Sequence, residues 1–268
     1  MRLDKYLAEA AVGTRKEVRS YVQDGKVMVN QQLVLNPAEE IDAEADSVLC
    51  FGREISHTKK VYYMFYKPSG CVTARTDETY RTVLDYFDDN HRQGIFPVGR
   101  LDKDTEGLLL LTNDGEFSHS LMHPDKHIEK TYFFWALGSL SEEDLKCLIN
   151  GIRLKSEEEL ARADMVKVME QGYYQDLKDH LEALITREAR VKPSLQSVVS
   201  GYLTISEGRK HQVKRMLKEV GCYVVYLKRT SIGALKLDET LPKGQYRELT
   251  EEELERLREL SSDRWFKD

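Results

Sequence analysis

Apolar positions recur at helical spacing in two short segments near the N-terminus, residues 3–10 and 18–22. Thr14 and Glu17 precede the second segment with the spacing of a capping box, in which each side chain bonds the backbone of the other residue. Residues 26–30 then alternate like a strand before a polar turn. The pattern predicts a small helix–helix–strand domain over residues 1–52, and the polar, aperiodic residues 53–60 predict a linker.

Short apolar runs bounded by turn residues continue along the rest of the chain. They predict strands at 61–66, 108–111, 130–137, 202–206 and 222–227. Helical spacing and capping residues predict helices at 81–87, 116–122, 141–151, 211–220 and 250–260. Residues 172–199 are polar and charged, and Leu177, Leu181 and Leu184 stand there at helical spacing. The chain therefore alternates helices and strands of ordinary length.

A polar cluster stands directly before the apolar run at 108–111. It consists of Arg100, Asp102 and Thr105 within the segment 99–115. Catalytic groups tend to lie on loops that a rigid scaffold holds, so Asp102 is a candidate active-site acid. A surface ion pair between Arg100 and Asp102 beside a core strand is the alternative that these residue types leave open.

Length and composition set the class of protein. The 268 residues suffice for one large domain or two unequal ones, and 41% hydrophobic with 32% charged residues is typical of soluble globular chains. No stretch approaches the roughly 20 apolar residues of a membrane span, and the N-terminus lacks the apolar core of a signal peptide. The four cysteines lie far apart, which indicates reduced thiols in a cytoplasmic protein without membrane contact.

Charge is distributed unevenly. The formal net charge of -6 argues weakly against a nucleic-acid partner, yet residues 200–236 carry eight basic residues against two acidic ones. Local asymmetry of this kind suits an anion-binding face on an acidic protein. A helix with a solvated, charged side explains the same pattern.

The N-terminal residues resemble a known RNA-binding domain. Arg2-Leu3-Asp4-Lys5-Tyr6-Leu7, the capping box, and Asp24-Gly25-Lys26-Val27-Met28-Val29-Asn30 are similar to the αL-type domain of a ribosomal small-subunit protein, which many RNA-modifying enzymes also carry. In that domain a glycine usually follows the asparagine, where this chain has Gln31. The resemblance implies that basic residues off the apolar faces bind RNA, and these are Arg2, Lys5, Arg15, Lys16, Arg19 and Lys26.

Four further motifs in this order resemble the bacterial RsuA-type pseudouridine synthases. They are Lys67-Pro68-Ser69-Gly70, Gly99-Arg100-Leu101-Asp102, Lys130-Thr131-Tyr132, and Glu207-Gly208-Arg209-Lys210-His211-Gln212-Val213-Lys214-Arg215-Met216. The resemblance implies an α+β fold, with a catalytic domain over 61–249 on a mixed, mainly antiparallel sheet, and a C-terminal helix and tail over 250–268. Residues 172–199 exceed the family pattern, and we predict that they form a surface helix away from Asp102.

The resemblance also implies roles for single residues. Asp102 matches the essential aspartate, Lys214 the basic residue that pairs with it, Tyr132 the tyrosine that packs on the base, and Arg100 the arginine that holds the displaced nucleotide. The residues Arg209, Lys210, His211, Gln212 and Arg215 are implied to contact RNA. Without the resemblance, the position of Tyr132 on an aromatic strand favours a core residue, and His211 is structural or RNA-contacting rather than catalytic.

These roles suit the chemistry of the isomerisation. Breaking a glycosidic bond builds positive charge on the sugar, which a positioned carboxylate stabilises or captures. A nearby ammonium orients that carboxylate, and an aromatic wall retains the detached uracil while it turns. The target base must be flipped out or unstacked in structured RNA.

We predict no cofactor and no metal site. Isomerisation needs neither, and the chain has no phosphate-binding glycine loop and no zinc-ligand spacing. His119, His123 and His127 are spaced by four, as metal ligands on one helix face are, but Pro124 interrupts that helix.

The predicted partner is ribosomal RNA or a partly assembled ribosomal subunit, and the predicted state is a monomer. Residues 204–209 and 156–160 most resemble family members that act on small-subunit (16S) RNA. Large-subunit members share every catalytic motif. A non-catalytic ribosome-assembly factor and an RNA methyltransferase with the same N-terminal domain are the alternatives from other classes.

Overall fold

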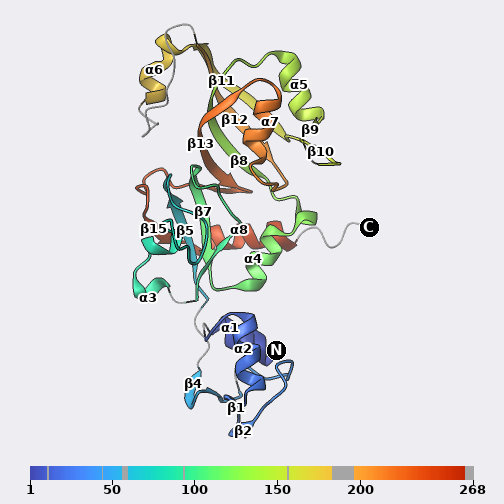
Figure 1. The fold of residues 1–268 in the computed structure, drawn as a ribbon, viewed down its shortest axis with the longest axis vertical. Coiled ribbons are helices and arrows are strands. Elements are labelled where there is room, and N and C mark those ends of the chain that lie inside the picture. Colours follow the sequence, from blue (N-terminus) through green and yellow to red (C-terminus); the bar gives the residue numbers. More distant parts are fainter. Residues whose placement is uncertain are drawn as a thin grey trace.

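A small N-terminal domain lies at one end of a larger domain built on one long sheet (Figure 1). The computed structural model describes residues 1–10, 12–43, 45–55, 60–92, 94–155, 157–182 and 196–262. The structure confirms the α+β class. No helix in these ranges has the length and apolarity needed to cross a membrane.

The N-terminal domain packs two helices on a short antiparallel sheet. Thr14 and Glu17 form the predicted capping box at the start of α2, and Leu3, Leu7 and Val22 are buried between the helices and the sheet. The strands follow the order β2-β1-β3-β4. The elements are α1 (Leu3–Glu9), α2 (Arg15–Gln23), β1 (Val27–Val29), β2 (Gln32–Leu33), β3 (Val48–Cys50) and β4 (Arg53–Ile55).

Two features of this domain differ from the sequence-based expectation. Asn30 and Gln31 form the turn between β1 and β2, with φ angles of 50° and 64°, so Gln31 takes the left-handed conformation that glycine adopts more readily. Arg53–Ile55 is strand β4 and pairs with β3, so the domain extends to Ile55 and the prediction of a linker from residue 53 is wrong. The hydroxyl of Tyr6 secures this strand by donating to Ile55 O at 2.8 Å.

In the described part of the larger domain, nine strands form one sheet. Its main order is β11-β12-β8-β13-β7-β5-β15, with β14 paired to β13 and β6 to β7. Every pairing is antiparallel except β13 with β7, which is parallel. The strands are β5 (Tyr62–Lys67), β6 (Phe96–Val98), β7 (Glu106–Thr112), β8 (Lys130–Leu137), β11 (Met165–Tyr173), β12 (Ser197–Ile205), β13 (Tyr223–Ile232), β14 (Leu235–Lys236) and β15 (Tyr246–Glu248).

Helices cover both faces of the sheet where β5 and β7 lie. Leu109 and Leu111 of β7 belong to a core that lies under η1 here and continues along the sheet to α5 and α7, whereas Leu108 and Leu110 belong to the core under α4 and α8. Burial on both faces explains the unbroken apolar run. The remaining elements are η1 (Val83–Tyr86), α3 (Asp89–Arg92), α4 (Gly115–Met122), η2 (Pro124–Lys126), α5 (Glu142–Asn150), β9 (Ile152–Arg153), β10 (Leu160–Ala161), α6 (Tyr174–Glu182), α7 (Gln212–Glu219) and α8 (Glu251–Ser262).

The predicted insertion contains a helix, but its ends are parts of the sheet. Tyr173 pairs with Ser197 where β11 meets β12, so the strands reach further into 172–199 than expected. Helix α6 follows, and its Leu181 is buried with Trp135, on the face of β8 opposite to Phe134 and α7. Leu184 lies outside the described residues.

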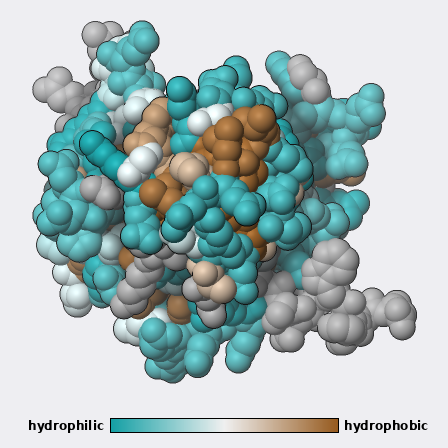
Figure 2. Space-filling model, turned by 90° about the horizontal axis from the view of Figure 1, so that it is seen from below, coloured by the Kyte–Doolittle hydropathy of each residue, from teal (hydrophilic) through white to brown (hydrophobic). Residues whose placement is uncertain are grey.

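The two domains touch through an ion pair between Lys5 of α1 and Glu116 of α4. Seen from the end formed by the N-terminal domain, the surface is mostly hydrophilic around one hydrophobic patch (Figure 2). The large apolar side chains that this domain exposes are Met28, Leu33, Leu35 and Phe51.

Candidate active site

Asp102 lies on the loop between β6 and β7, and neighbouring segments hold this loop in place. The ammonium group of Lys67, at the end of β5, donates to Lys103 O at 3.2 Å and to Thr105 O at 2.9 Å. Thr73 Oγ1 donates to Leu101 O at 2.7 Å. Lys67 thus fixes the backbone after Asp102, and Thr73 fixes the residue before it.

A lysine from helix α7 binds the carboxylate of Asp102. Lys214 Nζ lies 2.9 Å from Asp102 Oδ2 and 2.5 Å from Asp104 Oδ1. Burial opposes the ionisation of Asp104, but the hydrogen bond and charge of Lys214 outweigh it and hold the pKa of Asp104 below its usual value. His211 Nε2 lies 3.5 Å from Asp102 Oδ1, so the first turn of α7 faces the carboxylate from two positions.

Asp102 and Lys214 line a pocket of about 590 Å³ between the loop, α7 and the sheet. Tyr132, on β8, forms part of its wall and is 8% exposed, and Arg100 lies exposed at the same pocket. The four residues with predicted catalytic roles, of which Arg100 and Lys214 lie 114 residues apart in the sequence, therefore meet at one site. The pocket's size and mixed lining suit one nucleoside.

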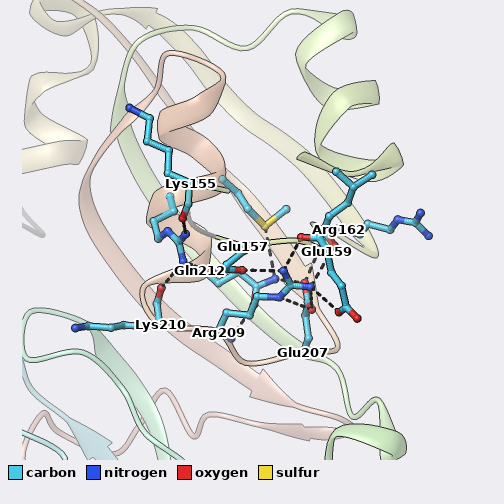
Figure 3. Close-up of polar contacts among 11 residues, drawn as sticks. Lys155, Glu157, Glu159, Arg162, Glu207, Arg209, Lys210 and Gln212 are labelled. Atoms are coloured by element: carbon cyan, nitrogen blue, oxygen red, sulfur yellow. Dashed lines mark hydrogen bonds and ion pairs between the residues drawn. The ribbon is translucent and has the colours of Figure 1, made fainter. Parts of the chain in front are cut away.

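Three residues of the basic motif have intramolecular partners instead of a free surface. Arg209 bonds Glu157 at 2.8 Å and Glu207 at 2.9 Å (Figure 3). Arg215 also pairs with Glu157. Gln212 is 3% exposed, and its side chain bonds Glu207 and the backbone N–H of Arg209. The side chains of all three residues thus brace the chain itself, although Arg209 and Gln212 also line the pocket, and their contact with RNA stays a prediction.

This network connects α7 to the segment that precedes β10. Arg209 also donates to the carbonyl oxygens of Glu159 and Leu160, and Arg215 to that of Lys155. The charges of Arg209 and Arg215 lower the pKa of Glu157 through hydrogen bonds. The contacts hold the start of α7, and with it Lys214, in register with the pocket. Lys210 and His211 remain exposed beside the pocket.

Four of the six basic residues predicted in the N-terminal domain line a second hollow, of about 830 Å³. They are Arg2, Arg15, Lys16 and Arg19. Buried Asp4 lies beneath them, with Arg2 at 2.9 Å and Arg19 at 3.0 Å. Burial favours the neutral form of Asp4, but the hydrogen bonds of both arginines lower its pKa. Lys5 pairs with Glu116, as described above, and Lys26 is exposed elsewhere on the domain.

Three residues at or beside the pocket received no role from the sequence analysis. Asp104 shares Lys214 with Asp102, and its place two residues after Asp102 was the available signal. Lys130 and Arg229 line the back of the pocket from β8 and β13. Arg229 is only 2% exposed, but it follows Lys228 after the apolar run at 222–227, so the local sequence carries no signal of its burial.

Among the described residues, no three histidine, cysteine, aspartate or glutamate side chains are grouped as metal ligands are. The rings of His119 and His123 lie 5.1 Å apart at the end of α4. All four cysteines carry free thiols.

Comparison with known proteins gives two family matches. Residues 61–219 match the RNA pseudouridylate synthase family, and residues 1–47 match the S4 domain. A solved structure described as a pseudouridylate synthase superimposes with a TM-score of 0.62 at 34% sequence identity, covering 96% of this chain and 99% of that one.

Relatives along the whole chain carry names of the same kind. An uncharacterized RNA pseudouridine synthase of Bacillus subtilis is 40% identical, over 97% of this chain and 99% of its own. The ribosomal large subunit pseudouridine synthase B of that organism is 38% identical, over 97% of this chain and 96% of its own. The ribosomal small subunit pseudouridine synthase A of Vibrio cholerae is 37% identical, over 95% of this chain and 98% of its own.

Proposed function

Because this chain belongs to the RNA pseudouridylate synthase family and carries an S4 domain, we propose that it converts a uridine of ribosomal RNA to pseudouridine. The observation that carries the proposal is the Asp102–Lys214 pair, 2.9 Å apart, in a pocket walled by Tyr132. A ribosomal substrate places the protein in the cytoplasm.

Asp102 is the proposed catalytic carboxylate. When the bond between C1′ and N1 of the uridine breaks, positive charge develops at C1′, and the carboxylate stabilises or captures it. Lys214 holds one oxygen of this carboxylate by a charge-assisted hydrogen bond, which fixes its orientation before the substrate arrives. Asp104 accepts a second hydrogen bond from the same ammonium group and so helps to hold Lys214 in place.

Tyr132 and Arg100 are proposed to control the base. The detached uracil must turn and bond to C1′ through C5 without leaving, and the buried ring of Tyr132 offers a flat apolar wall for this rotation. Arg100, exposed at the pocket, is placed to hold the nucleotide that moves out of the RNA stack.

Two basic surfaces are proposed to bind the RNA backbone. Arg2, Arg15, Lys16 and Arg19 surround the hollow of the N-terminal domain, and Lys210 and His211 lie beside the catalytic pocket. Phosphate contacts of this kind position an RNA without reading its sequence. They also explain how an acidic chain holds a polyanion.

Within the family we propose small-subunit RNA as the substrate. The support is the likeness of residues 204–209 and 156–160 to small-subunit members, and in this structure the two segments meet where Arg209 bonds Glu157. The large-subunit relative at 38% identity favours large-subunit RNA as the second candidate.

Tritium release from RNA labelled at uridine C5 tests this proposal. The purified protein is offered small-subunit RNA, large-subunit RNA and partly assembled subunits of each kind, without added cofactor. Release from small-subunit substrates is the expected result, and release only from large-subunit substrates would replace the finer proposal. Tight binding without release from any substrate would favour a non-catalytic assembly factor.

A further inference from the structure

The back wall of the catalytic pocket carries polar groups that none of the roles above uses. Thr105, Lys130 and Arg229 line the pocket together with Asp102 and Tyr132. Thr105 and Arg229 are buried, with exposures of 1% and 2%. Burial of a charged or hydroxyl group is costly unless it finds a partner, so their position calls for an explanation.

Arg229 stands directly beside Tyr132. The two residues are register partners in the antiparallel pair of β8 and β13, which places their side chains on one face of the sheet. Lys130 lies two residues before Tyr132 and shares that face. The aromatic wall and the cationic wall of the pocket are therefore contiguous.

The guanidinium group of Arg229 is held at one side and unpartnered at the other. Its Nε donates to Leu108 O at 2.8 Å, which fixes the group inside the sheet. Its Nη2 has no hydrogen-bond partner among the described residues. β7 comes unusually close here, since a Cβ on Gly107 would lie 2.2 Å from Arg229 O.

Thr105 shows the same combination. Its backbone is fixed on both sides, because its N–H donates to Asp102 O at 3.1 Å and its carbonyl accepts from Lys67 at 2.9 Å. Its hydroxyl Oγ1 is buried and, in the described parts of the chain, without a partner. Two rigidly mounted polar groups with unused hydrogen-bonding capacity thus line the pocket that holds Asp102 and Tyr132.

We propose that Arg229 and Thr105 bind the polar edge of the target uracil, and that Arg229 stabilises the negative charge on the base after it separates from the sugar. The inference rests on the proposed function. Uracil offers two carbonyl acceptors and one N–H donor. A guanidinium N–H and a hydroxyl, which donates or accepts, are complementary to these groups. The ring of Tyr132 covers the face of the base while they hold its edge.

The charge follows from the electron count of the reaction. When the bond between N1 and C1′ breaks, its electron pair stays on the uracil and spreads to the carbonyl oxygens, while C1′ bonds to Asp102 or is stabilised by it. The base then turns, and C5 bonds to C1′, which releases the Asp102 carboxylate with its electron pair where it had bonded. The proton then leaves C5, and N1 takes up a proton. The uracil is anionic only between these events, so a cation fixed at its edge acts mainly in the transition state.

Lys130 adds to the positive potential of this wall. Its Nζ donates to Ile128 O at 2.7 Å, and burial, together with the charge of Arg229, lowers its pKa to about 8. The charge of Asp164 acts in the opposite direction.

Single-turnover tritium release and RNA binding separate this role from a purely structural one. Arg229→Met is expected to slow release by roughly 10²- to 10³-fold, the usual effect of removing one preorganised donor, with RNA affinity changed less than about threefold. Thr105→Val is expected to slow release by roughly threefold to tenfold without loss of thermal stability, since the hydroxyl has no protein partner to lose. Arg229→Lys, which keeps the charge, is expected to fall between wild type and Arg229→Met.

Matched controls come from the neighbouring positions of β13. Lys228 pairs with Glu239 at 3.1 Å and does not line the pocket, so Lys228→Met is expected to retain the wild-type rate. Thr230 Oγ1 donates to Thr131 O at 3.2 Å, so Thr230→Val is expected to lose stability and keep the rate. Should Arg229→Met fail to fold, Thr105→Val and Arg229→Lys carry the test.

RNAs with 2-thiouridine or 4-thiouridine at the target site identify the contact itself, with products read by nucleoside chromatography. Sulfur accepts hydrogen bonds weakly, so one of the two analogues is expected to slow the wild type and to cause no further loss in Arg229→Met. The inference would be overturned if both analogues slowed Arg229→Met by the same factor as they slow the wild type. It would also be overturned if Thr105→Val and Arg229→Met both released tritium at the wild-type rate. Absence of release by the wild type would instead refute the proposed function.

Discussion

Lys67 supports the catalytic loop from a fully buried position, and its replacement by methionine is the most informative perturbation of the scaffold. Its ammonium group donates to Pro68 O at 3.0 Å, Lys103 O at 3.2 Å and Thr105 O at 2.9 Å. Asp102 and Asp104 lie on the loop segment that these carbonyls define. Lys67→Met keeps the unbranched apolar stem of the side chain and removes the ammonium group with its three donors.

The expected cost follows from these contacts. Hydrogen bonds to a charged group contribute about 1.5–3 kcal/mol each, and each carbonyl left unpaired loses stabilisation. Burial opposes the charge and lowers the pKa of Lys67, while the carboxylates of Asp104, Glu106 and Asp102 act in the opposite direction. Because desolvation cancels part of the gain, we expect a net loss of about 2–4 kcal/mol in the free energy of unfolding.

The loss of activity is expected to exceed the loss of folded protein. A shift of about 1 Å in the reacting groups costs roughly 10²-fold in rate, which is the loss expected for Lys67→Met. To separate this loss from unfolding, the variant is assayed by single-turnover tritium release at a temperature where urea titration shows that it is folded. Lys243→Met is the control, because Lys243 pairs with Glu106 at 2.7 Å and does not bond the loop carbonyls. Wild-type stability and rate in Lys67→Met would refute the reasoning.

Gly107→Ala places a Cβ 2.2 Å from Arg229 O at a φ of +102° and is expected to lower the free energy of unfolding by roughly 3 kcal/mol or more, measured by thermal unfolding. Gly52, with a φ of +73°, has open space around it, so Gly52→Ala is expected to lose far less stability. Equal losses in the two variants would contradict this. Asp114 caps α4 and binds Lys60 at 2.9 Å. Although burial opposes its ionisation, these contacts lower its pKa below the usual 3.8. Asp114→Asn is therefore expected to lower the free energy of unfolding by about 1–2 kcal/mol at pH 7, measured by urea titration. The difference from wild type is expected to vanish as the pH falls through the lowered pKa of Asp114. A difference in stability that does not change with pH would exclude this. The double variant Arg15→Gln/Lys16→Gln is expected to reduce the slope of log RNA affinity against log salt concentration by about 0.7–0.9 for each residue replaced. Lys178→Gln on α6 is the control and is expected to leave the slope unchanged. An unchanged slope in the double variant would show that the N-terminal hollow does not bind the RNA backbone.

The parts of the fold that the sequence predicted are those with a strong local signal. The run at 108–111 is buried on both faces, and capping boxes mark the start of α2 and α5. Strand β11 escaped prediction because its residues alternate between exposed and half-buried, and none is fully buried. Its length comes from pairing with β12, a tertiary effect that local pattern does not encode.

The candidate site shows the same division. Spacing alone does not bring Asp102 to Lys214, 112 residues later; family motifs supplied that expectation, and the structure places the pair 2.9 Å apart. The motif implied that Gln212 contacts RNA, but not that its side chain bonds Glu207 in the first turn of α7. Arg229 gained its place from the register of β13 with β8 and β7, which only the assembled sheet determines.

Asp102→Asn, measured by tritium release beside Asp104→Asn, tests the central claim most directly. Both carboxylates bond Lys214, so the two variants disturb the same ammonium group and differ in which carboxylate is lost. The account predicts no release above background for Asp102→Asn, with RNA binding retained, and a rate within about tenfold of wild type for Asp104→Asn. Release by Asp102→Asn at the wild-type rate would contradict it.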